Sequence, residues 1–191
     1  EPENMYAPDH ATWVEVPALA NTLCGLSRPI HFRGVCTVVL KLFMLAQPSL
    51  AVFGEKDWQQ LAIIKKMVSD LNVPVEVVGR PIVREADGLA LSSRNVYLTP
   101  EERAQAPQIR KSLEMAAGLA AGGERDAARI IEAVRGYLAE HLPTGEEDYI
   151  SIVDPAVLTK VDRIEDMALC ALAIRLGKAR LIDNILLKVG E

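Results

Sequence analysis

The sequence has no concentration of positive charge. Its 191 residues carry a formal net charge of −5, and the 21 lysines and arginines are scattered along the chain. A protein that binds nucleic acid through phosphate contacts gathers basic residues on one face or along one helix. The composition therefore argues against a nucleic-acid partner, and any attraction for an anionic substrate must be local.

Cysteine and histidine are too few and too dispersed to form a metal centre or a catalytic pair. The three cysteines have no metal-ligand spacing, and the chain has no Cys–His pair and no Ser–His–Asp set. An odd number of dispersed cysteines is typical of reduced, mostly packed thiols in a cytosolic protein. We therefore assign no nucleophile and no structural metal, and we predict a cytoplasmic location. The residues concerned are Cys24, Cys36, Cys170, His10, His31 and His141.

Long apolar runs are also missing. The longest candidate, residues 35–46, is interrupted by Lys41 and is too short to cross a bilayer. No signal peptide is evident, so we expect no membrane partner. Half of the residues are apolar and a quarter are charged, which is typical of an ordinary globular protein of one or two domains.

The first part of the chain alternates between strand and helix patterns. An apolar run ended by Pro48 predicts a helix, and short β-rich runs before and after the later helix predict strands. A strand–helix–strand order of this kind favours parallel pairing with helical crossovers, an α/β layer fold. The predicted elements are a strand at 13–16, a short helix at 17–23, a polar loop at 25–33, a helix at 35–46, a buried strand at 50–53, a helix at 58–71 capped by Asp57 with an apolar stripe of Leu61, Ile64, Val68 and Leu71, and a strand at 75–78.

After Arg80-Pro81 the pattern changes to helices followed by strands. Thr99-Pro100-Glu101-Glu102 is a capping box that predicts a helix toward Ala121, ended by a pair of glycines. A second helix is predicted over 126–141, then strands over 149–153, 167–174 and 179–187, with a tight Gly177-Lys178 turn between the last two. This order predicts a separate α+β domain with an antiparallel sheet, and we place the boundary between residues 82 and 83.

A glycine, a lysine and an aspartate follow directly on the strand predicted over 50–53. The run is Phe53-Gly54-Glu55-Lys56-Asp57-Trp58-Gln59-Gln60. Ligands of parallel sheets bind beyond the carboxyl ends of the strands, and a lysine just before a helix can pair with phosphate oxygens while backbone amides donate hydrogen bonds. Gly54 suits either a positive φ or the close approach of a ligand. The alternative for Lys56 is a solvated loop lysine, the usual state of this residue type.

A second run gathers hydroxyl groups and a guanidinium on an irregular stretch. It reads Ala90-Leu91-Ser92-Ser93-Arg94-Asn95 and follows the turn-forming pair Asp87-Gly88. Such a loop can close over the phosphates of a nucleotide and neutralise their charge. The alternative is a plain serine-rich turn. Glu85 and Asp87 are interpreted as turn formers and not as a pair of catalytic carboxylates.

Together with His31-Phe32-Arg33-Gly34-Val35, these two runs resemble the pantothenate synthetases, ligases that join pantoate to β-alanine using ATP. The resemblance extends from about Trp13 to Gly190 and rests on Gly-Glu-Lys-Asp-aromatic-Gln-Gln followed by Leu-Ser-Ser-Arg-Asn. It implies that residues 1–82 are the C-terminal portion of a Rossmann-like nucleotide- and pantoate-binding domain. It also implies that residues 83–191 are a smaller α+β domain, a lid over the ATP site.

The resemblance implies the site residues as well. Gln60 is expected to bind pantoate, and Val83 to contact the nucleotide through its backbone; the alternative for Gln60 is an exposed helix glutamine. The expected catalytic residues are Lys56, Ser92, Ser93 and Arg94. The expected ATP-binding residues are Gly54, Glu55, Lys56, Asp57, Val83, Leu91, Ser92, Ser93 and Arg94.

His31, Arg33 and Arg28 are further candidates for the substrate pocket. They either line the pocket of the acid substrate or steady the phosphates. In the alternative, Arg33 pairs with a nearby carboxylate while His31 packs in the predicted loop.

By resemblance, pantoate first attacks the α-phosphorus of ATP, giving pantoyl adenylate and pyrophosphate, and the amine of β-alanine then displaces AMP. ATP is thus a substrate, Mg²⁺ is expected to bridge its phosphates without protein ligands that we can identify, and a homodimer is expected.

One departure from the family matters. The family's histidine motif, of the type Met-Gly-x-Leu-His-x-Gly-His, has no counterpart in this sequence. We therefore expect a synthetase that lacks an N-terminal part. Two alternatives stay open: a catalytically incomplete module that only binds substrate or dimerises, and a related adenylating nucleotidyltransferase.

Overall fold

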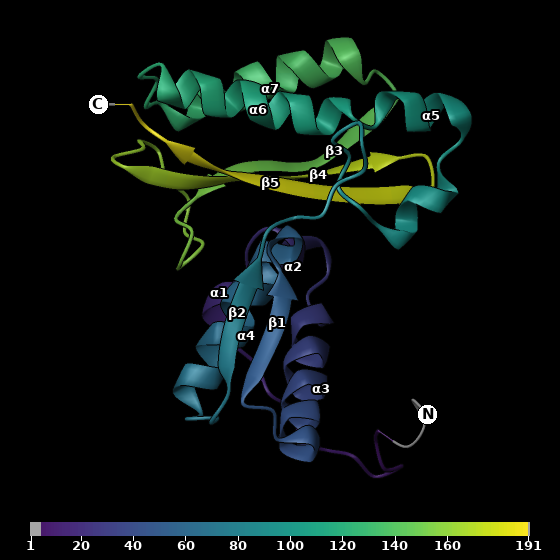
Figure 1. The fold of residues 1–191 in the computed structure, drawn as a ribbon, viewed down its shortest axis with the longest axis vertical. Helices are drawn as coiled ribbons and strands as arrows, with labels where there is room; N and C mark the ends of the chain where they lie inside the picture. The colour runs from purple at the N-terminus through teal and green to yellow at the C-terminus, as the bar shows by residue number, and fades with distance from the viewer. Residues whose placement is uncertain (1–4, 191) are drawn as a thin grey trace. The chain divides into compact units, whose positions relative to one another are not determined.

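The computed structural model describes residues 5–190, and the chain divides into two compact units, Glu1–Arg80 and Pro81–Glu191. The domain boundary predicted from the sequence lies two residues after this division. The first unit carries a parallel pair of strands and the second an antiparallel sheet (Figure 1). The predicted fold class, a parallel α/β part followed by a small α+β part, is confirmed. Among the described residues, no helix has the length and apolar character needed to cross a bilayer.

The first unit is built around the parallel pair β1–β2. The pairing runs in register from Leu50 opposite Glu76 to Gly54 opposite Arg80. Helices α3 and α4 pack on each other, and α4 connects the two strands. The elements are α1 (Pro17–Ala20), α2 (Cys24–Ser27), α3 (His31–Ala46), β1 (Leu50–Gly54), the 3-10 turn η2 (Glu55–Asp57), α4 (Trp58–Asp70) and β2 (Glu76–Arg80).

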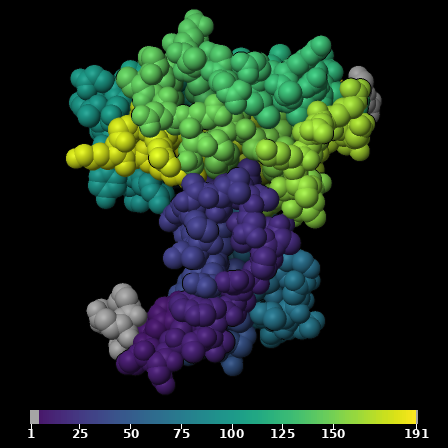
Figure 2. Space-filling model, turned by 180° about the vertical axis from the view of Figure 1, so that it is seen from behind, coloured from purple at the N-terminus to yellow at the C-terminus, as the bar shows by residue number. Residues whose placement is uncertain are grey.

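The strand predicted over 13–16 is wrong, because this segment has no regular structure and packs against α3 instead. The Val14 N–H donates a hydrogen bond to Thr37 Oγ1 at 3.1 Å. The Arg33 guanidinium lies over the Trp13 ring, 5.1 Å from its centroid. The alternation of apolar and polar side chains in this segment therefore arises from contacts with α3, and not from pairing in a β-sheet. Figure 2 shows the N-terminal segment, in purple, on the surface of the first unit.

Two helix boundaries in the first unit differ from prediction. The helix expected over 17–23 stops at Ala20, and the polar loop expected over 25–33 contains the short helix α2. Helix α3 begins at His31, four residues earlier than predicted. Phe32 is the one large apolar residue of its first turn, so the continuous apolar run from which the helix is predicted starts after the helix has begun.

Burial in β1 and α4 also differs from prediction. Strand β1 was expected to be buried, but Leu50 and Val52 are about half exposed, at 48% and 56%. In α4, Leu61 and Ile64 are buried as expected, whereas Leu71 lies beyond the helix and is exposed. In β1, only Ala51 and Phe53 are partly buried. The sheet has two strands, and helices α3 and α4 pack on one another beside it.

The second unit is a three-stranded antiparallel sheet, in the order β3–β4–β5, with helices on one face (Figure 1). The three predicted strands are confirmed; β3 begins four residues earlier than expected, and β4 and β5 end two residues and one residue later. A β-bulge interrupts β3 between Glu147 and Tyr149. The elements are the 3-10 turn η3 (Ser93–Tyr97), α5 (Pro100–Gln105), α6 (Gln108–Ala121), α7 (Ala127–His141), β3 (Gly145–Val153), β4 (Met167–Leu176) and β5 (Ala179–Lys188).

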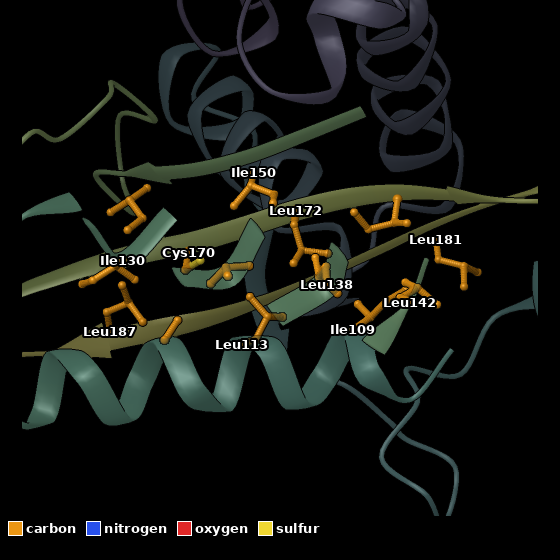
Figure 3. Packing of buried hydrophobic residues seen from close by; sticks show 14 of the residues in the cluster. Ile109, Leu113, Ile130, Leu138, Leu142, Ile150, Cys170, Leu172, Leu181 and Leu187 are labelled. Atoms are coloured by element: carbon orange, nitrogen blue, oxygen red, sulfur yellow. The ribbon is translucent and has the colours of Figure 1, made fainter. Parts of the chain in front are cut away.

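The core of the second unit lies between the sheet and the pair α6–α7. Alternate residues of β4, from Ala168 to Leu176, face the helices, as the period-two geometry of a strand requires. Helix α6 contributes Ile109 and Leu113, and α7 contributes Ile130 and Leu138; these side chains meet Cys170, Leu172 and Leu187 in Figure 3. Burial of apolar area at about 25 cal/mol per Å² is the main source of this unit's stability.

The helix predicted from Thr99 to Ala121 is two helices. The capping box is confirmed: the Thr99 Oγ1 accepts from the Glu102 N–H at 3.3 Å, and the Thr99 N–H donates to Glu102 Oε2 at 2.8 Å. The helical hydrogen-bond pattern is interrupted at Ala106-Pro107, although both residues keep right-handed helical dihedral angles, and it resumes at Gln108. Proline has no N–H to continue the ladder, which accounts for the break. Helix α7 begins as predicted, with the Asp126 side chain accepting from the N–H groups of Ala128 and Arg129.

The tight turn between β4 and β5 is also as predicted. Gly177 has a φ of +54°, and a Cβ at this position would overlap the Glu102 carboxylate. Glycine is therefore needed both for the backbone conformation and for the contact with α5.

Candidate functional site

The Lys56 segment lies at the carboxyl end of the parallel pair. Gly54 is the last residue of β1, η2 carries Glu55, Lys56 and Asp57, and α4 starts immediately afterwards. Lys56 is half-buried, whereas Asp57 is exposed. The strand exit, the lysine and the helix start therefore lie where a parallel sheet binds its ligands.

Gly54 does not have the positive φ that the sequence left open. Its φ is −74°, an extended conformation open to any residue, and a Cβ would meet no other heavy atom within 4 Å. The first of the two reasons offered for this glycine is thus wrong. Close approach of a ligand stays a prediction.

The glycine that permits a close approach in this segment is Gly79, on β2. A Cβ there would lie 2.9 Å from both Glu55 Oε1 and Leu61 Cδ2. The Glu55 side chain is thus held across the neighbouring strand, beside the start of α4. No local pattern indicates this contact, since Gly79 and Glu55 are far apart in the sequence and meet only when β1 and β2 pair.

Asp57 is at the N-cap position of α4 but does not cap it. Its side chain accepts no hydrogen bond from the first turn of the helix, so the predicted cap is wrong. Asp57 is also the last residue of the 3-10 turn η2, with φ −91° and ψ 59°, and it is exposed. Of the two roles considered for Asp57, contact with ATP stays a prediction.

The two adjacent glutamines of α4 have different environments. Gln59 is 5% exposed, and its Nε2 donates to the carbonyl oxygens of Leu19 at 2.8 Å and Thr22 at 2.7 Å. Its Oε1 accepts from the Cys24 N–H at 3.1 Å. Gln60, the predicted pantoate ligand, is half-buried. Sequence reasoning missed Gln59, whose partners are 35 to 40 positions away.

Leu23, in the segment that Gln59 holds, has a strained backbone. Its φ of +44° is in the region that favours glycine, yet its side chain is buried at 7% exposure. The Gln59 amide bonds on both sides of this residue and keeps the turn in place. Strain of this kind persists only where surrounding contacts over-determine it.

The other candidates of the first unit lie at the N-terminus of α3. His31 and Arg33 are in its first turn, whereas the sequence predicted a preceding loop, and Arg28 is exposed before it. Arg33 Nε is 3.4 Å from Glu15 Oε1. Arg33 thus makes the carboxylate contact of the structural alternative, and its role in substrate binding stays a prediction.

The second group of candidates forms a short hairpin-like loop in the second unit. The Leu91 N–H donates to the Val83 carbonyl at 2.9 Å, and Arg84 and Ala90 form an antiparallel bridge. Val83 and Leu91 are exposed at 67% and 56%. These hydrogen bonds bring Val83, expected to act through its backbone, next to the start of the Leu91–Arg94 run.

The serines and Arg94 lie at the start of η3. Ser92 Oγ accepts from the Arg94 N–H at 3.2 Å and caps this turn, so one of the two predicted hydroxyl groups has a structural contact. Ser93 and Arg94 are exposed. The structure brings together Val83, Leu91, Ser92, Ser93 and Arg94 in one loop.

An ion pair in the sheet anchors the beginning of this loop. Arg84 donates to both Asp183 carboxylate oxygens, at 2.7 and 2.9 Å, and also to the Gly88 carbonyl at 3.1 Å. The Asp183 side chain is 2% exposed, in the middle of β5. Sequence reasoning missed both residues; an aspartate within the apolar strand run 179–187 was the available signal.

A second network joins the loop to α5. Arg103 donates to Glu85 Oε2 and to Asp87 Oδ2, both at 2.6 Å, and Asn95 Nδ2 donates to Glu85 Oε1 at 2.6 Å. Hydrogen bonds from Asn95 and Arg103 lower the pKa of Glu85, and the hydrogen bond from Arg103 lowers the pKa of Asp87. The two carboxylates remain ionised at neutral pH.

Asp87 does form the turn predicted for it, since its Oδ1 accepts from the Leu89 N–H at 3.2 Å and Gly88 has a φ of +91°. The turn-former interpretation of Glu85 and Asp87 omitted their common partner, Arg103. That arginine is 16 positions from Asp87, on another element.

The two buried thiols, Cys36 and Cys170, are poorly suited to act as nucleophiles. Burial raises the pKa of Cys36 to about 11 and that of Cys170 to about 12, so both are protonated at neutral pH. Cys36 and Cys170 are buried and Cys24 is half-buried, and none of the three is in a disulfide. Within residues 5–190, no group of three or more His, Cys, Asp or Glu side chains is arranged to hold a metal ion.

The chemical groups offered by the two units are cations, hydroxyls, amides and backbone N–H groups. Lys56 and the helix starts contribute them in the first unit, and Ser92, Ser93 and Arg94 in the second. Groups of this kind bind and orient anions and stabilise charge that develops in a transition state. They are not the set required for a covalent intermediate on the protein.

Solved structures define the class of protein. The chain is similar to the pantothenate synthetase of Thermus thermophilus, with a TM-score of 0.92 and 46% identity over 97% of this chain and 67% of that one. It is also similar to the pantoate-beta-alanine ligase of Francisella tularensis, solved in complex with beta-gamma ATP and beta-alanine. That match has a TM-score of 0.68 and 31% identity over 94% of this chain and 60% of the other.

The family model described as Pantoate-beta-alanine ligase matches residues 1–186, and the chain belongs to this family. It is 67% identical over 191 residues to the pantothenate synthetase of Nitratidesulfovibrio vulgaris strain Miyazaki F and 52% identical over 185 residues to that of Thermotoga neapolitana. It covers 67% of the first and 66% of the second, about two thirds of their length. The resemblance inferred from the two sequence runs is confirmed.

Proposed function

We propose that this chain is the ATP- and substrate-binding part of an enzyme that condenses pantoate with β-alanine, giving pantothenate, AMP and pyrophosphate through a pantoyl adenylate. The observation that carries the proposal is the position of Lys56, at the carboxyl end of β1 and just before α4. Membership of the ligase family and the Francisella tularensis ligase bound to a form of ATP and beta-alanine support it.

In the first step the pantoate carboxylate attacks the α-phosphorus, and pyrophosphate leaves. Lys56 supplies a positive charge to the phosphates, and the N–H groups at the start of α4 donate to the same anion. Arg94 and the hydroxyls of Ser92 and Ser93 stabilise the charge on the departing pyrophosphate. The proposal therefore requires both units to contribute to one ATP molecule, the second as a lid.

The substrates are bound by neighbouring groups. Gly54, Glu55, Asp57, Val83 and Leu91 contact ATP, the last two through the backbone of the hairpin-like loop. Gln60 orients pantoate, with His31, Arg33 and Arg28 at the edge of the acid pocket.

Aligning the carboxylate with the α-phosphorus, and later the amine of β-alanine with the acyl carbon, is the main catalytic requirement. Mg²⁺ supplied with ATP would neutralise part of the phosphate charge, and we assign no residue of this chain to hold it. We also propose that the protein forms a homodimer and is located in the cytoplasm.

Lys56→Ala in the complete enzyme tests the assignment. We expect an intact fold and adenylate formation slowed at least about a hundredfold, the loss typical of removing one charge-stabilising group. The measurement is single-turnover release of pyrophosphate from ATP and pantoate, with circular dichroism to check folding. Lys66→Ala is the matched control, because Lys66 is an exposed lysine of α4 whose partner is Asp70.

Near-normal adenylation by Lys56→Ala would refute the role given to this lysine. Equal losses in Lys56→Ala and Lys66→Ala would show a general effect of charge. Pyrophosphate release with other carboxylic acids in place of pantoate would favour a different adenylating enzyme.

A second candidate function is a module that binds substrate without turnover. The observation behind it is that the chain spans about two thirds of its relatives' length. Calorimetry with ATP on this chain, followed by assay of its turnover, separates the two: binding without pyrophosphate release supports the module, and release supports the enzyme.

A further inference from the structure

The loop that carries Arg94 is fastened to α5 through one arginine. Arg103 reaches from α5 to two carboxylates of the loop, with its Nη2 2.6 Å from Glu85 Oε2 and its Nη1 2.6 Å from Asp87 Oδ2. A guanidinium donates through several N–H groups held in one plane, so it can fix the relative positions of two acceptors. Arg103 therefore holds the carboxylates of both Glu85 and Asp87 against α5.

Glu85 extends this connection to the far end of the candidate loop. Its second oxygen, Oε1, accepts from Asn95 Nδ2 at 2.6 Å, and the same amide nitrogen donates to the Ala90 carbonyl at 3.2 Å. Ala90 and Asn95 are the residues immediately before and after Leu91–Arg94. The network thus holds both ends of the segment expected to contact ATP.

The Asn95 side chain is oriented by the hydrogen bonds that its own Nδ2 donates. Its Nδ2 has two acceptors, while its buried Oδ1 has no hydrogen-bond partner among the described residues. An amide placed with an unsatisfied acceptor costs free energy. The two donated bonds must offset this cost, which makes the position of Asn95 dependent on the Glu85 carboxylate.

The network contributes geometry more than stability. The Arg103, Glu85 and Asp87 side chains are about one third exposed, at 32%, 29% and 39%. Ion pairs of this exposure contribute little to the free energy of folding because water screens them. A loop that must present an arginine to a phosphate nevertheless needs to be held close to its working geometry, since small displacements lower the rate strongly.

We propose that Arg103 is a positioning residue: through Glu85 and Asn95 it presets the Ser92-Ser93-Arg94 loop for the polyphosphate. Arg103 itself touches no substrate in this proposal. The inference rests on the proposed function only for the identity of the ligand, because the positioning of the loop can be measured without ATP.

The main variant is Arg103→Met, which keeps the length of the stem and removes the donors. Arg135→Met is the matched control: Arg135 bridges Glu132 and Glu147, both at 2.8 Å, and links α7 to β3. Like Arg103→Met, Arg135→Met removes the contacts of one arginine with two carboxylates, but these contacts lie between α7 and β3. Arg103→Lys is a second variant, since lysine keeps the charge but cannot hold two carboxylates in one plane.

The first readout is amide hydrogen exchange without ATP. The N–H groups of Leu91, Arg94 and Asn95 are bonded to the Val83 carbonyl, Ser92 Oγ and the Ser92 carbonyl. We expect exchange at these amides to rise at least about fivefold in Arg103→Met, with unchanged exchange in α6 and α7. Arg135→Met should leave the loop amides unchanged, and both variants should unfold at similar temperatures.

The second readout is the adenylation half-reaction in the complete enzyme. Arg103→Met should raise the KM for ATP about tenfold and leave the KM for β-alanine within about twofold, with Arg103→Lys in between. In an Arg94→Ala background the same substitution should have a smaller effect than in the wild type, because part of its effect passes through Arg94.

Unchanged exchange of the loop amides in Arg103→Met would overturn the inference, whatever the kinetics. Faster exchange with normal use of ATP would also overturn it, since the position of the loop would not matter to the ligand. Multiplicative losses with Arg94→Ala would also contradict the inference, because they would show that Arg103 does not position Arg94 for ATP. Failure of the proposed function is a separate result, seen as normal adenylation in Lys56→Ala.

Discussion

At the residue scale, neighbours of the same type have different roles. Gln59 is buried and bonds to the backbone of Leu19, Thr22 and Cys24, while Gln60 is half-buried in the next position of α4. Consecutive helix residues point about 100° apart, so one faces the segment 19–24 and the other does not. The sequence shows both glutamines but not which of them faces this segment, because that depends on residues 35 or more positions away.

Gln59→Leu is expected to destabilise the protein by about 2–3 kcal/mol, since it leaves a buried N–H and two carbonyl groups without their partner. Gln60→Leu should change stability by less than about 1 kcal/mol and should instead impair the use of pantoate. Urea unfolding of both variants, together with steady-state kinetics, checks this pair. Equal stabilities of the two variants would contradict the structural role of Gln59.

Residue roles were the least predictable part of the site. Lys56, Ser92, Ser93 and Arg94 stand out in the sequence because they follow a strand or a turn signal. Arg103, Asn95, Asp183 and Gln59 do not, because each acts through a partner on another element. Polar contacts of long sequence separation carry no local pattern by which to find them.

At the element scale, local signals predicted what local physics determines. The capping box at Thr99 and the glycine turn at 177 formed as expected, since their partners are within three residues or on the adjoining strand. The strand at 13–16 did not form, because Val14 bonds to a helix side chain. A proline interrupts the helical pattern at position 107, and the single helix predicted over 99–121 does not take account of this local signal.

The hairpin-like loop of residues 83–95 should respond to acid. Glu85 and Asp87 have pKa values below their usual values, chiefly through hydrogen bonds from Asn95 and Arg103 to the first and from Arg103 to the second. Each carboxylate therefore stabilises the folded state above the ordinary pKa, near 4, and the contribution is lost as pH falls through the lower folded value.

We expect the free energy of unfolding to fall more steeply between about pH 5 and about pH 3 in the wild type than in Arg103→Met. Urea unfolding of both proteins across this pH range measures the difference in slope. The contributions of all other carboxylates are common to both proteins and cancel in that difference. Parallel curves for the two proteins would contradict the assigned contacts. The repulsion between Glu85 and Asp87, which the arginine offsets, should make the variant the less stable protein at neutral pH.

At the scale of the whole molecule, the order of elements predicted the fold class. A parallel pair joined by a helix, then helices, then three antiparallel strands is what the sequence pattern indicated and what the chain forms. Exposure was less predictable: Leu50 and Val52 were expected to be buried and are not. Hydrophobicity along a strand does not reveal how many layers cover it.

The central claim, that Lys56 and Arg94 act on the same triphosphate, concerns two residues of different units. Its most direct test is a double-mutant cycle on single-turnover pyrophosphate release, comparing Lys56→Ala, Arg94→Ala and the double variant in the complete enzyme. We predict that the double variant loses less than the product of the single losses, with a coupling of more than about 1 kcal/mol. Losses that multiply to within about 0.5 kcal/mol would contradict the claim, since residues that share no ligand act independently.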